Sequence, residues 1–174
     1  MWLTESGRPP KPGSRTLSGY ALRWDVQSPV RRDFDEVFRP HSLDIPANVP
    51  AHINHDRSIP IASTAAGTMR LRTDDVGLWV EVDCPHTDAG DELLHGSRFG
   101  TFTGWSIAFR ASSEHWDRSG DRPLRIVERA RLVEVSLADR GAHVTTLGVL
   151  ARMAPPGGAD LGSWAALPWY RCGG

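Results

Sequence analysis

Ser106 lies in a run of residues typical of a strand, Gly-Trp-Ser-Ile-Ala-Phe-Arg at 104–110, where its hydroxyl could serve as a nucleophile. Side chains alternate between the two faces of a strand, so three large apolar residues would share a core face: Trp105, Ile107 and Phe109. The opposite face would carry Ser106 between Gly104 and Ala108. Two such small neighbours leave room for an extended peptide above the hydroxyl, which a nucleophile requires.

A serine hydroxyl needs a general base, and His55 is the candidate because an ordinary imidazole takes and returns a proton near neutral pH. The two residues are 51 positions apart (106 − 55), so the fold must bring them together. Glu134 interrupts an apolar run, Leu-Val-Glu-Val-Ser-Leu, and would point away from Val133 and Val135. It is the candidate third group, which would orient the imidazole and stabilise its protonated form.

Each of these residues also has an ordinary interpretation. Ser106 fits a plain strand serine, His55 a capping or core histidine, and Glu134 a solvated carboxylate. The order His, Ser, Glu is weak evidence alone, because the same geometry recurs in unrelated chain orders. A zinc-binding module is a further alternative, since His52-x-x-His55 and Cys84-x-His86 offer up to four ligands.

The pattern along the chain predicts the elements that must position these side chains. Strands are expected at Ser18–Trp24, Phe34–Phe38, Thr101–Arg110, Leu124–Ala138 and Val144–Leu150, with a hairpin of Thr68–Arg72 and Leu78–Asp83 joined by residues 73–77. The inner face of that hairpin would carry Met69, Leu71, Leu78, Val80 and Val82. A short helix is expected at Asp88–His95, with Asp88 as N-cap and Gly96 as its stop, and Ser112–Pro123 is expected to be a surface loop.

Six or seven strands with few helices, and no alternation of strand and helix, predict a mainly β protein. We expect a closed or nearly closed antiparallel β-barrel. Residues 1–16 are rich in Pro, Gly, Arg and Ser and are expected to form a flexible lead. The domain itself would span 17–151, and 152–174 would be a Pro/Gly linker and tail.

Composition excludes several classes of protein. With 20 Lys and Arg against 21 Asp and Glu, the net charge is −1, so we expect no nucleic-acid partner. No apolar stretch approaches the roughly 20 residues that span a bilayer, and the N-terminus lacks a signal-peptide pattern, so no membrane association is expected. Two cysteines, Cys84 and Cys172, make no disulfide framework and indicate a reduced, intracellular protein.

The chain resembles the serine proteases that mature the proheads of tailed phages, distant relatives of herpesvirus assemblin. The resemblance runs from about Ser18 to Ala142. It is carried by Ser-Gly-Tyr-Ala-Leu at 18–22, Asp-Glu-Val-Phe-Arg-Pro-His-Ser-Leu at 35–43, Asn-His-Asp at 54–56, Asp-Val-Gly-Leu-Trp-Val at 75–80, Gly-Trp-Ser-Ile-Ala-Phe at 104–109 and Glu-Val-Ser-Leu at 134–137. Two positions depart from the family pattern: Ala108 replaces a common glycine, and Ala138–Ala142 replaces a proline-alanine turn.

The resemblance implies an assemblin-like β-barrel with catalytic Ser106 and His55 and with Glu134 as third member, a position that is a second histidine in assemblins. By analogy with the arginine pair of assemblins, Arg140 could serve the oxyanion site; a surface turn arginine is the ordinary alternative. It further implies a cofactor-free endopeptidase acting in the host cytoplasm, within the assembling procapsid. Its substrates would be scaffold protein or the N-terminal segment of the major capsid protein, and itself. A homo-oligomer and a non-enzymatic capsid-assembly or scaffold component with the same fold stay open.

Overall fold

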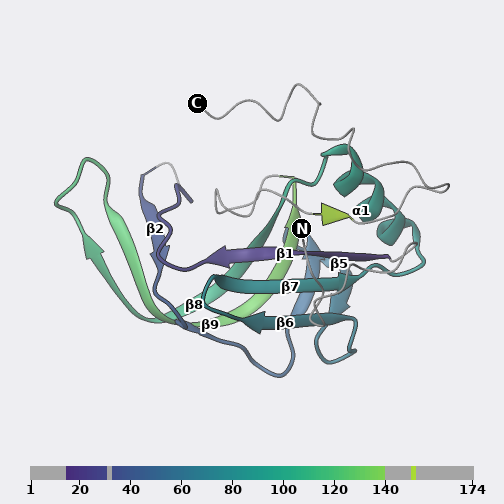
Figure 1. Ribbon diagram of the computed structural model, residues 1–174, viewed down its shortest axis with the longest axis horizontal. Helices are drawn as coiled ribbons and strands as arrows, with labels where there is room; N and C mark the ends of the chain where they lie inside the picture. Colours follow the sequence, from purple (N-terminus) through teal and green to yellow (C-terminus); the bar gives the residue numbers. More distant parts are fainter. Residues whose placement is uncertain (1–14, 31–32, 140–149, 152–174) are drawn as a thin grey trace. The chain divides into compact units, whose positions relative to one another are not determined.

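The computed structural model describes residues 15–30, 33–139 and 150–151. Within them, a single helix, α1 (Asp88–Phe99), accompanies ten strands (Figure 1). The strands are β1 (Thr16–Arg23), β2 (Asp35–Phe38), β3 (Leu43–Asp44), β4 (Pro50–Ile53), β5 (Asp56–Ser63), β6 (Met69–Thr73), β7 (Gly77–Asp83), β8 (Gly104–Asp117), β9 (Leu124–Ala138) and β10 (Leu150–Ala151). The predicted mainly β class is therefore confirmed.

The first sheet has the strand order β10-β1-β7-β6, and all its pairs are antiparallel. It contains the predicted hairpin, now β6 and β7, in which Met69 pairs with Val82 and Leu71 with Val80. The turn closes where Asp74 Oδ1 accepts the backbone N–H groups of Val76 and Gly77, at 2.9 and 3.0 Å. Gly77 admits no side chain, because a Cβ there would lie 1.9 Å from the carbonyl oxygen of Leu22.

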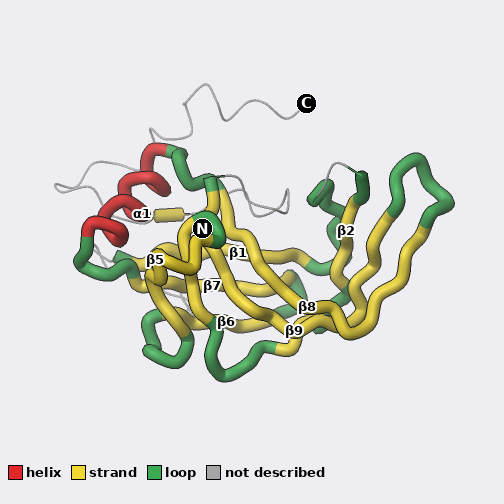
Figure 2. Tube along the Cα trace, turned by 180° about the vertical axis from the view of Figure 1, so that it is seen from behind, coloured by secondary structure: helices red, strands yellow, loops and turns green. Residues whose placement is uncertain are grey.

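The second sheet is built around β9. Strand β8 runs antiparallel along one side of β9, while β2, β3 and β4 follow one another along the other side, all parallel to it. Strand β5 then pairs antiparallel with β4. Figures 1 and 2 show the strands of the first sheet lying across β8 and β9, as two layers with β1 close to β8.

The predicted antiparallel barrel is wrong in two respects. The second sheet is mixed, because chain segments far from β9 in sequence return to pair with it in parallel. In the described part of the chain neither sheet closes on itself. A physical reason is length: β8 and β9 have 14 and 15 residues, so β9 extends about 50 Å. The first sheet has strands of at most 8 residues and cannot accompany β8 and β9 to their far ends.

The far ends of β8 and β9 form a hairpin arm, residues 110–131, that extends away from the first sheet (Figure 1). The sequence predicted a loop over Ser112–Pro123, but β8 continues to Asp117. Apolar alternation fails there because the arm is stabilised by polar contacts instead. Arg125 bonds both Glu114 and Glu36, and His115 lies 3.2 Å from Glu128.

Helix α1 is longer than predicted and has different caps. Thr87 is the N-cap, its Oγ1 accepting the N–H of Gly90 at 3.2 Å, and Gly100 ends the helix with φ 79°. The predicted stop, Gly96, lies inside the helix. A Cβ on Gly96 would come within 2.3 Å of the Phe102 ring, so this glycine serves packing.

The strand prediction for Leu124–Ala138 is confirmed by β9, and β1 and β2 lie within a few residues of their predicted ranges. Strand β5 was not predicted. Residues 1–14 of the predicted lead, the tail at 152–174 and most of the last predicted strand lie outside the described residues. Thr16, the last residue of that lead, begins β1.

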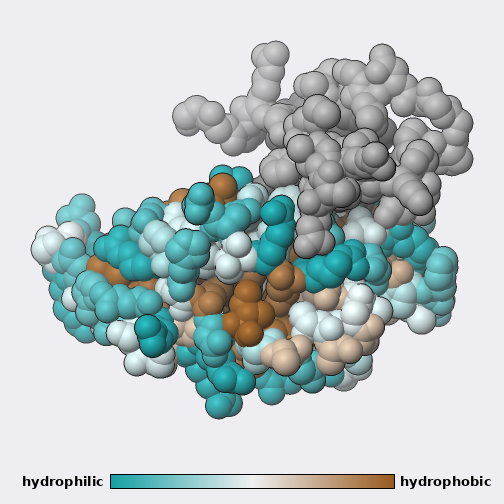
Figure 3. All heavy atoms as spheres, turned by 60° about the horizontal axis from the view of Figure 1, so that its bottom comes forward, coloured by the Kyte–Doolittle hydropathy of each residue, from teal (hydrophilic) through white to brown (hydrophobic). Residues whose placement is uncertain are grey.

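The face seen in Figure 3 is largely hydrophilic, with apolar residues gathered near its centre and in smaller spots elsewhere. Among the described helices, none combines the length and the apolar character that a membrane span demands.

Candidate functional site

Ser106 lies near the start of β8, directly opposite Ser136 of β9. The predicted division of faces is confirmed: Trp105 and Ile107 are buried on the core side. Ser106 itself is only 5 % exposed. By strand alternation, the face that carries Ser106 also carries Glu134 and Ser136 of β9. His52 of β4 is the register partner of Ser136, which brings a histidine to the same end of the sheet.

His55 occupies the two-residue turn that joins β4 to β5. Asn54 and His55 have φ values of 48° and 62°, the left-handed pair that a tight type I′ hairpin turn requires. Three hydrogen bonds fix the turn to the end of β9: Asn54 N–H to the Leu137 carbonyl (2.9 Å), Asp139 N–H to Asn54 Oδ1 (3.1 Å), and His55 N–H to Ser136 Oγ (3.1 Å). The turn thereby aims the imidazole at β8 and β9.

The structure brings the three sequence-predicted side chains together. His55 Nε2 lies 2.8 Å from Ser106 Oγ, and His55 Nδ1 lies 2.6 Å from Glu134 Oε1. A carboxylate only accepts, so Nδ1 carries the proton and Nε2 is left with a lone pair toward the serine hydroxyl. This arrangement can move a proton from Ser106 to the imidazole while Glu134 balances the charge that results.

Glu134 is nearly out of solvent, with its side chain 3 % exposed. Its second oxygen, Oε2, faces two cations or potential cations: Arg57 Nε at 3.4 Å and His52 Nδ1 at 3.5 Å. Ser136 Oγ donates to Oε1 across 3.5 Å. A buried carboxylate is costly unless it is paired and hydrogen-bonded, and these neighbours satisfy Glu134 from both sides.

Sequence reasoning gave no role to Arg57 or Ser136 and considered His52 only as a metal ligand. Ser136 had a usable signal, because Glu-x-Ser in a strand places both side chains on one face. The sequence carries no such signal for His52 or Arg57, since their contacts depend on the parallel pairing of β4 with β9.

The four zinc ligands that the sequence offered are not gathered into a site. His52 and His55 turn toward Glu134, His86 is exposed, and Cys84 is buried at the end of β7. Burial raises the pKa of the Cys84 thiol to about 12, which disfavours the thiolate that zinc binds. In residues 15–30, 33–139 and 150–151, no three His, Cys, Asp or Glu side chains are arranged to hold a metal ion.

Arg140, the candidate oxyanion residue, lies outside the described residues. Its role stays a prediction.

Comparison with known proteins completes these observations. The family model described as caudovirus prohead serine protease matches residues 6–154, most of the chain and all the residues of the site. A search of curated proteins returns no match.

Proposed function

The chain belongs to the caudovirus prohead serine protease family, and from this premise we propose that it is an active serine endopeptidase of capsid maturation. The family implies a capsid or scaffold protein as substrate and action in the assembling procapsid in the host cytoplasm. Our proposal is finer. The enzyme would cleave scaffold protein or the N-terminal segment of the major capsid protein, and it would also cleave itself.

In the proposed mechanism Ser106 Oγ attacks the scissile carbonyl carbon while its proton passes to His55 Nε2. Glu134 stabilises the imidazolium that forms, and the tetrahedral intermediate collapses as Nε2–H protonates the leaving amine. Water then enters, His55 takes its proton, and the acyl ester on Ser106 is hydrolysed. Backbone amides, with Arg140 as the proposed side-chain donor, would hold the oxyanion.

The observation that carries the proposal is the unbroken chain of contacts from Ser106 through His55 to Glu134, at 2.8 and 2.6 Å. The non-enzymatic alternative, a scaffold component with the same fold, accounts for it poorly. A structural protein gains little from burying a carboxylate beside two histidines.

The test is cleavage of the capsid or scaffold protein by the wild type and by Ser106→Ala, followed by intact mass spectrometry. We expect Ser106→Ala to remain folded and to lose nearly all cleavage, since triad knockouts elsewhere retain only about 10³–10⁴-fold over water. Ser113→Ala is the matched control, because Ser113 is an exposed serine on the same strand. Cleavage by Ser106→Ala at the wild-type rate would reject the proposal.

Self-cleavage has its own readout. The Pro/Gly segment at 155–158 is the region where we propose that the chain shortens itself. A wild-type protein that keeps its full mass under conditions where it cuts substrate contradicts this part. The relation to assemblin also stays a proposal, with Glu134 in place of the second histidine.

A further inference from the structure

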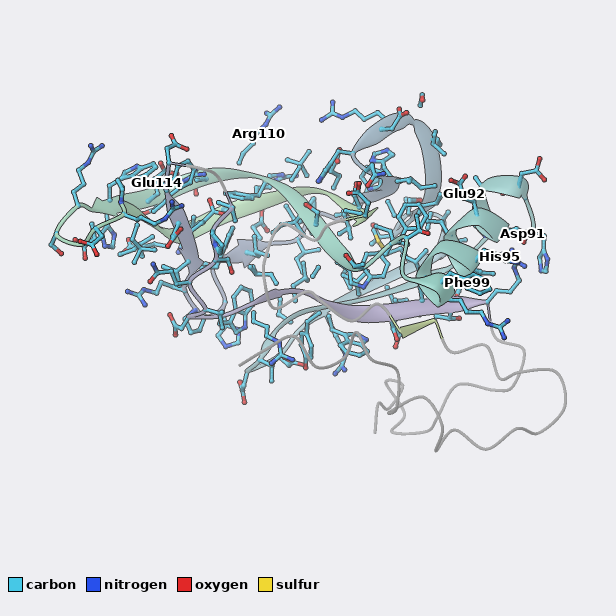
Figure 4. The ribbon with its side chains drawn as sticks, turned by 90° about the horizontal axis from the view of Figure 1, so that it is seen from above. Asp91, Glu92, His95, Phe99, Arg110 and Glu114 are labelled. Carbon is cyan, nitrogen blue, oxygen red and sulfur yellow. The ribbon has the colours of Figure 1, made fainter. Side chains whose placement is uncertain are left out.

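Arg110 lies on the same face of β8 as Ser106, four residues along the strand. Between them, Phe109 turns the other way, its ring 4.8 Å from that of Phe38 on β2. The pairing irregularity at this point puts the extra residue, Val133, on β9, so the alternation of β8 is uninterrupted. Figure 4 shows Arg110 projecting outward from β8.

A second arginine lies directly across from Arg110. The register pairs Arg110 with Arg131 of β9. Arg131 is mostly exposed, and it forms a 3.5 Å ion pair with an equally exposed Asp44. Like charges opposite each other destabilise a sheet. Arg57 adds a third charge nearby, because it contacts Glu134, whose register partner is Ala108.

Three other arginines of the hairpin arm have partners. Arg122 and Arg125 bond carboxylates, and Arg118 lies over the Trp116 ring at 5.8 Å. The Arg110 guanidinium has no hydrogen bond, ion pair or ring contact with any residue the structure describes. Within the described residues its charge is therefore left free to pair with a bound molecule.

By alternation, Ala108 is the residue of β8 between Ser106 and Arg110 on that face, and its small side chain adds little bulk there. Four residues of strand cover about 13 Å, and an extended peptide spans the same distance with about four of its own residues. A peptide whose scissile bond lies at Ser106 and which runs along β8 would thus present a side chain to Arg110.

We propose that Arg110, with Arg131 beside it and Arg57 between it and the site, is a specificity subsite for an acidic residue of the substrate, three to five positions from the cleaved bond. A substrate carboxylate there would pair with the guanidinium of Arg110 and relieve the repulsion between Arg110 and Arg131. The inference rests on the proposed function and names a substrate class for it, peptides with Asp or Glu at that position.

The experiment is cleavage of a randomised synthetic peptide library, with the cut sites identified by mass spectrometry. For the wild type we expect Asp and Glu over Asn and Gln by about tenfold at one position in that window. Arg110→Gln should reduce the preference to within about twofold, and Arg110→Glu should reverse it in favour of Lys and Arg. Arg118→Glu, the same charge change at the far end of the arm, should retain the wild-type preference.

The outcomes separate the two proposals. Cleavage without an acidic preference, or a preference that survives Arg110→Glu, overturns the proposed subsite. Either result leaves the proposed protease function standing. A wild-type protein that cuts no peptide contradicts the proposed function and the subsite together. Thermal melts of each variant establish that the altered preference belongs to a folded enzyme.

Discussion

Glu134 shows how single residues determine the chemistry of this site. Its carboxylate is 3 % exposed and is contacted by His55 on one oxygen and by Arg57 and His52 on the other. Charge buried in this way is retained only where partners replace water. Those partners also limit how the carboxylate can turn. In the proposed mechanism the oriented carboxylate keeps His55 in the tautomer that accepts a proton from Ser106.

Replacements of Glu134 test whether it orients His55. Glu134→Gln keeps the shape but loses the charge that stabilises the imidazolium, so kcat/KM should fall about 10–10³-fold, less than the roughly 10⁴ in kcat measured for the acid-to-amide change in a well-studied triad. Glu134→His should recover part of that loss and Glu134→Ala none. The measurement is kcat/KM on one peptide, with melts to confirm folding. Three variants equal to wild type would leave a Ser-His dyad.

His52 is expected to hold the outer oxygen of Glu134. Its Nδ1 is buried and lies 3.5 Å from Oε2, and it has no hydrogen-bond partner in the described residues. His52→Ala should lower kcat about tenfold with KM unchanged, because a polar group beside the buried carboxylate is lost. His52→Asn keeps a donor near the Nδ1 position and should restore most of the rate, whereas His52→Gln should not. Equal rates for the Asn and Gln variants would assign His52 to packing alone.

At the scale of elements, the β4–β5 hairpin positions His55, the proposed general base. Its two-residue turn places both central residues at positive φ, and β4 aligns in parallel with the end of β9, so that His52, Ser136 and the turn share one end of the sheet. A one-residue shift of this pairing would send the site residues of β4 to the opposite face.

The turn can be tested at Asn54. Asn54→Ala puts alanine at φ 48°, a left-handed conformation that costs an ordinary residue roughly 1–2 kcal/mol of stability. The change also removes the side-chain oxygen that accepts the Asp139 N–H. We expect a lower melting temperature and a displaced His55 with slower cleavage. Asn54→Gly accepts the backbone and should regain stability, although the Asp139 bond stays lost. If Asn54→Ala matches wild type in both melting temperature and rate, the turn does not position His55.

How far the sequence predicts these elements depends on whether the signal is local. β9 and the β6–β7 hairpin follow from alternation and a turn sequence, and both are confirmed. The faces of Ser106 and Glu134 follow in the same way. The parallel pairing of β4 with β9 and the contacts of Arg57 join segments up to 84 residues apart (136 − 52), for which no local pattern exists. The reach of β8 to Asp117 depends on polar pairs across the hairpin, which apolar alternation does not reveal.

On the scale of the whole molecule, the first sheet closes the core behind the site and is held by an ionic network on its outer face. Arg70 bonds Glu81 at 3.0 Å and both oxygens of Asp83, at 2.7 and 2.9 Å. Thr16 adds a hydrogen bond to Asp83, which ties the start of β1 to β7. This network joins three neighbouring strands, β1, β7 and β6.

The network predicts how stability depends on pH. The hydrogen bonds from Arg70, and then from Thr16, hold the pKa of Asp83 below its ordinary value despite partial burial. The ionised form is thus favoured by folding. The ionised Asp83 therefore contributes to the stability of the folded protein above about pH 4, the ordinary pKa of aspartate. This contribution is lost as the pH falls through the lower pKa that Asp83 has in the folded state.

Asp83→Asn should therefore lower the melting temperature at pH 7 by about 1–3 °C, a modest effect because Asp83 is half exposed. The difference from wild type should narrow as the pH falls below about 4. Asp75→Asn, at an exposed aspartate in the β6–β7 turn, is the control. A gap of the same size at pH 7 and pH 3 would show that the carboxylate charge is not what stabilises this face.

The central claim, that His55 activates Ser106, can be measured without knowing the natural substrate. A fluorophosphonate reacts when a serine oxygen attacks phosphorus and fluoride leaves, so its rate reports the nucleophile directly. We predict a single modification, located at Ser106 by peptide mass spectrometry, with a rate that falls at least about 100-fold in His55→Ala and to zero at this position in Ser106→Ala. A wild-type protein that is not modified at Ser106, or an unchanged rate in folded His55→Ala, would contradict the account.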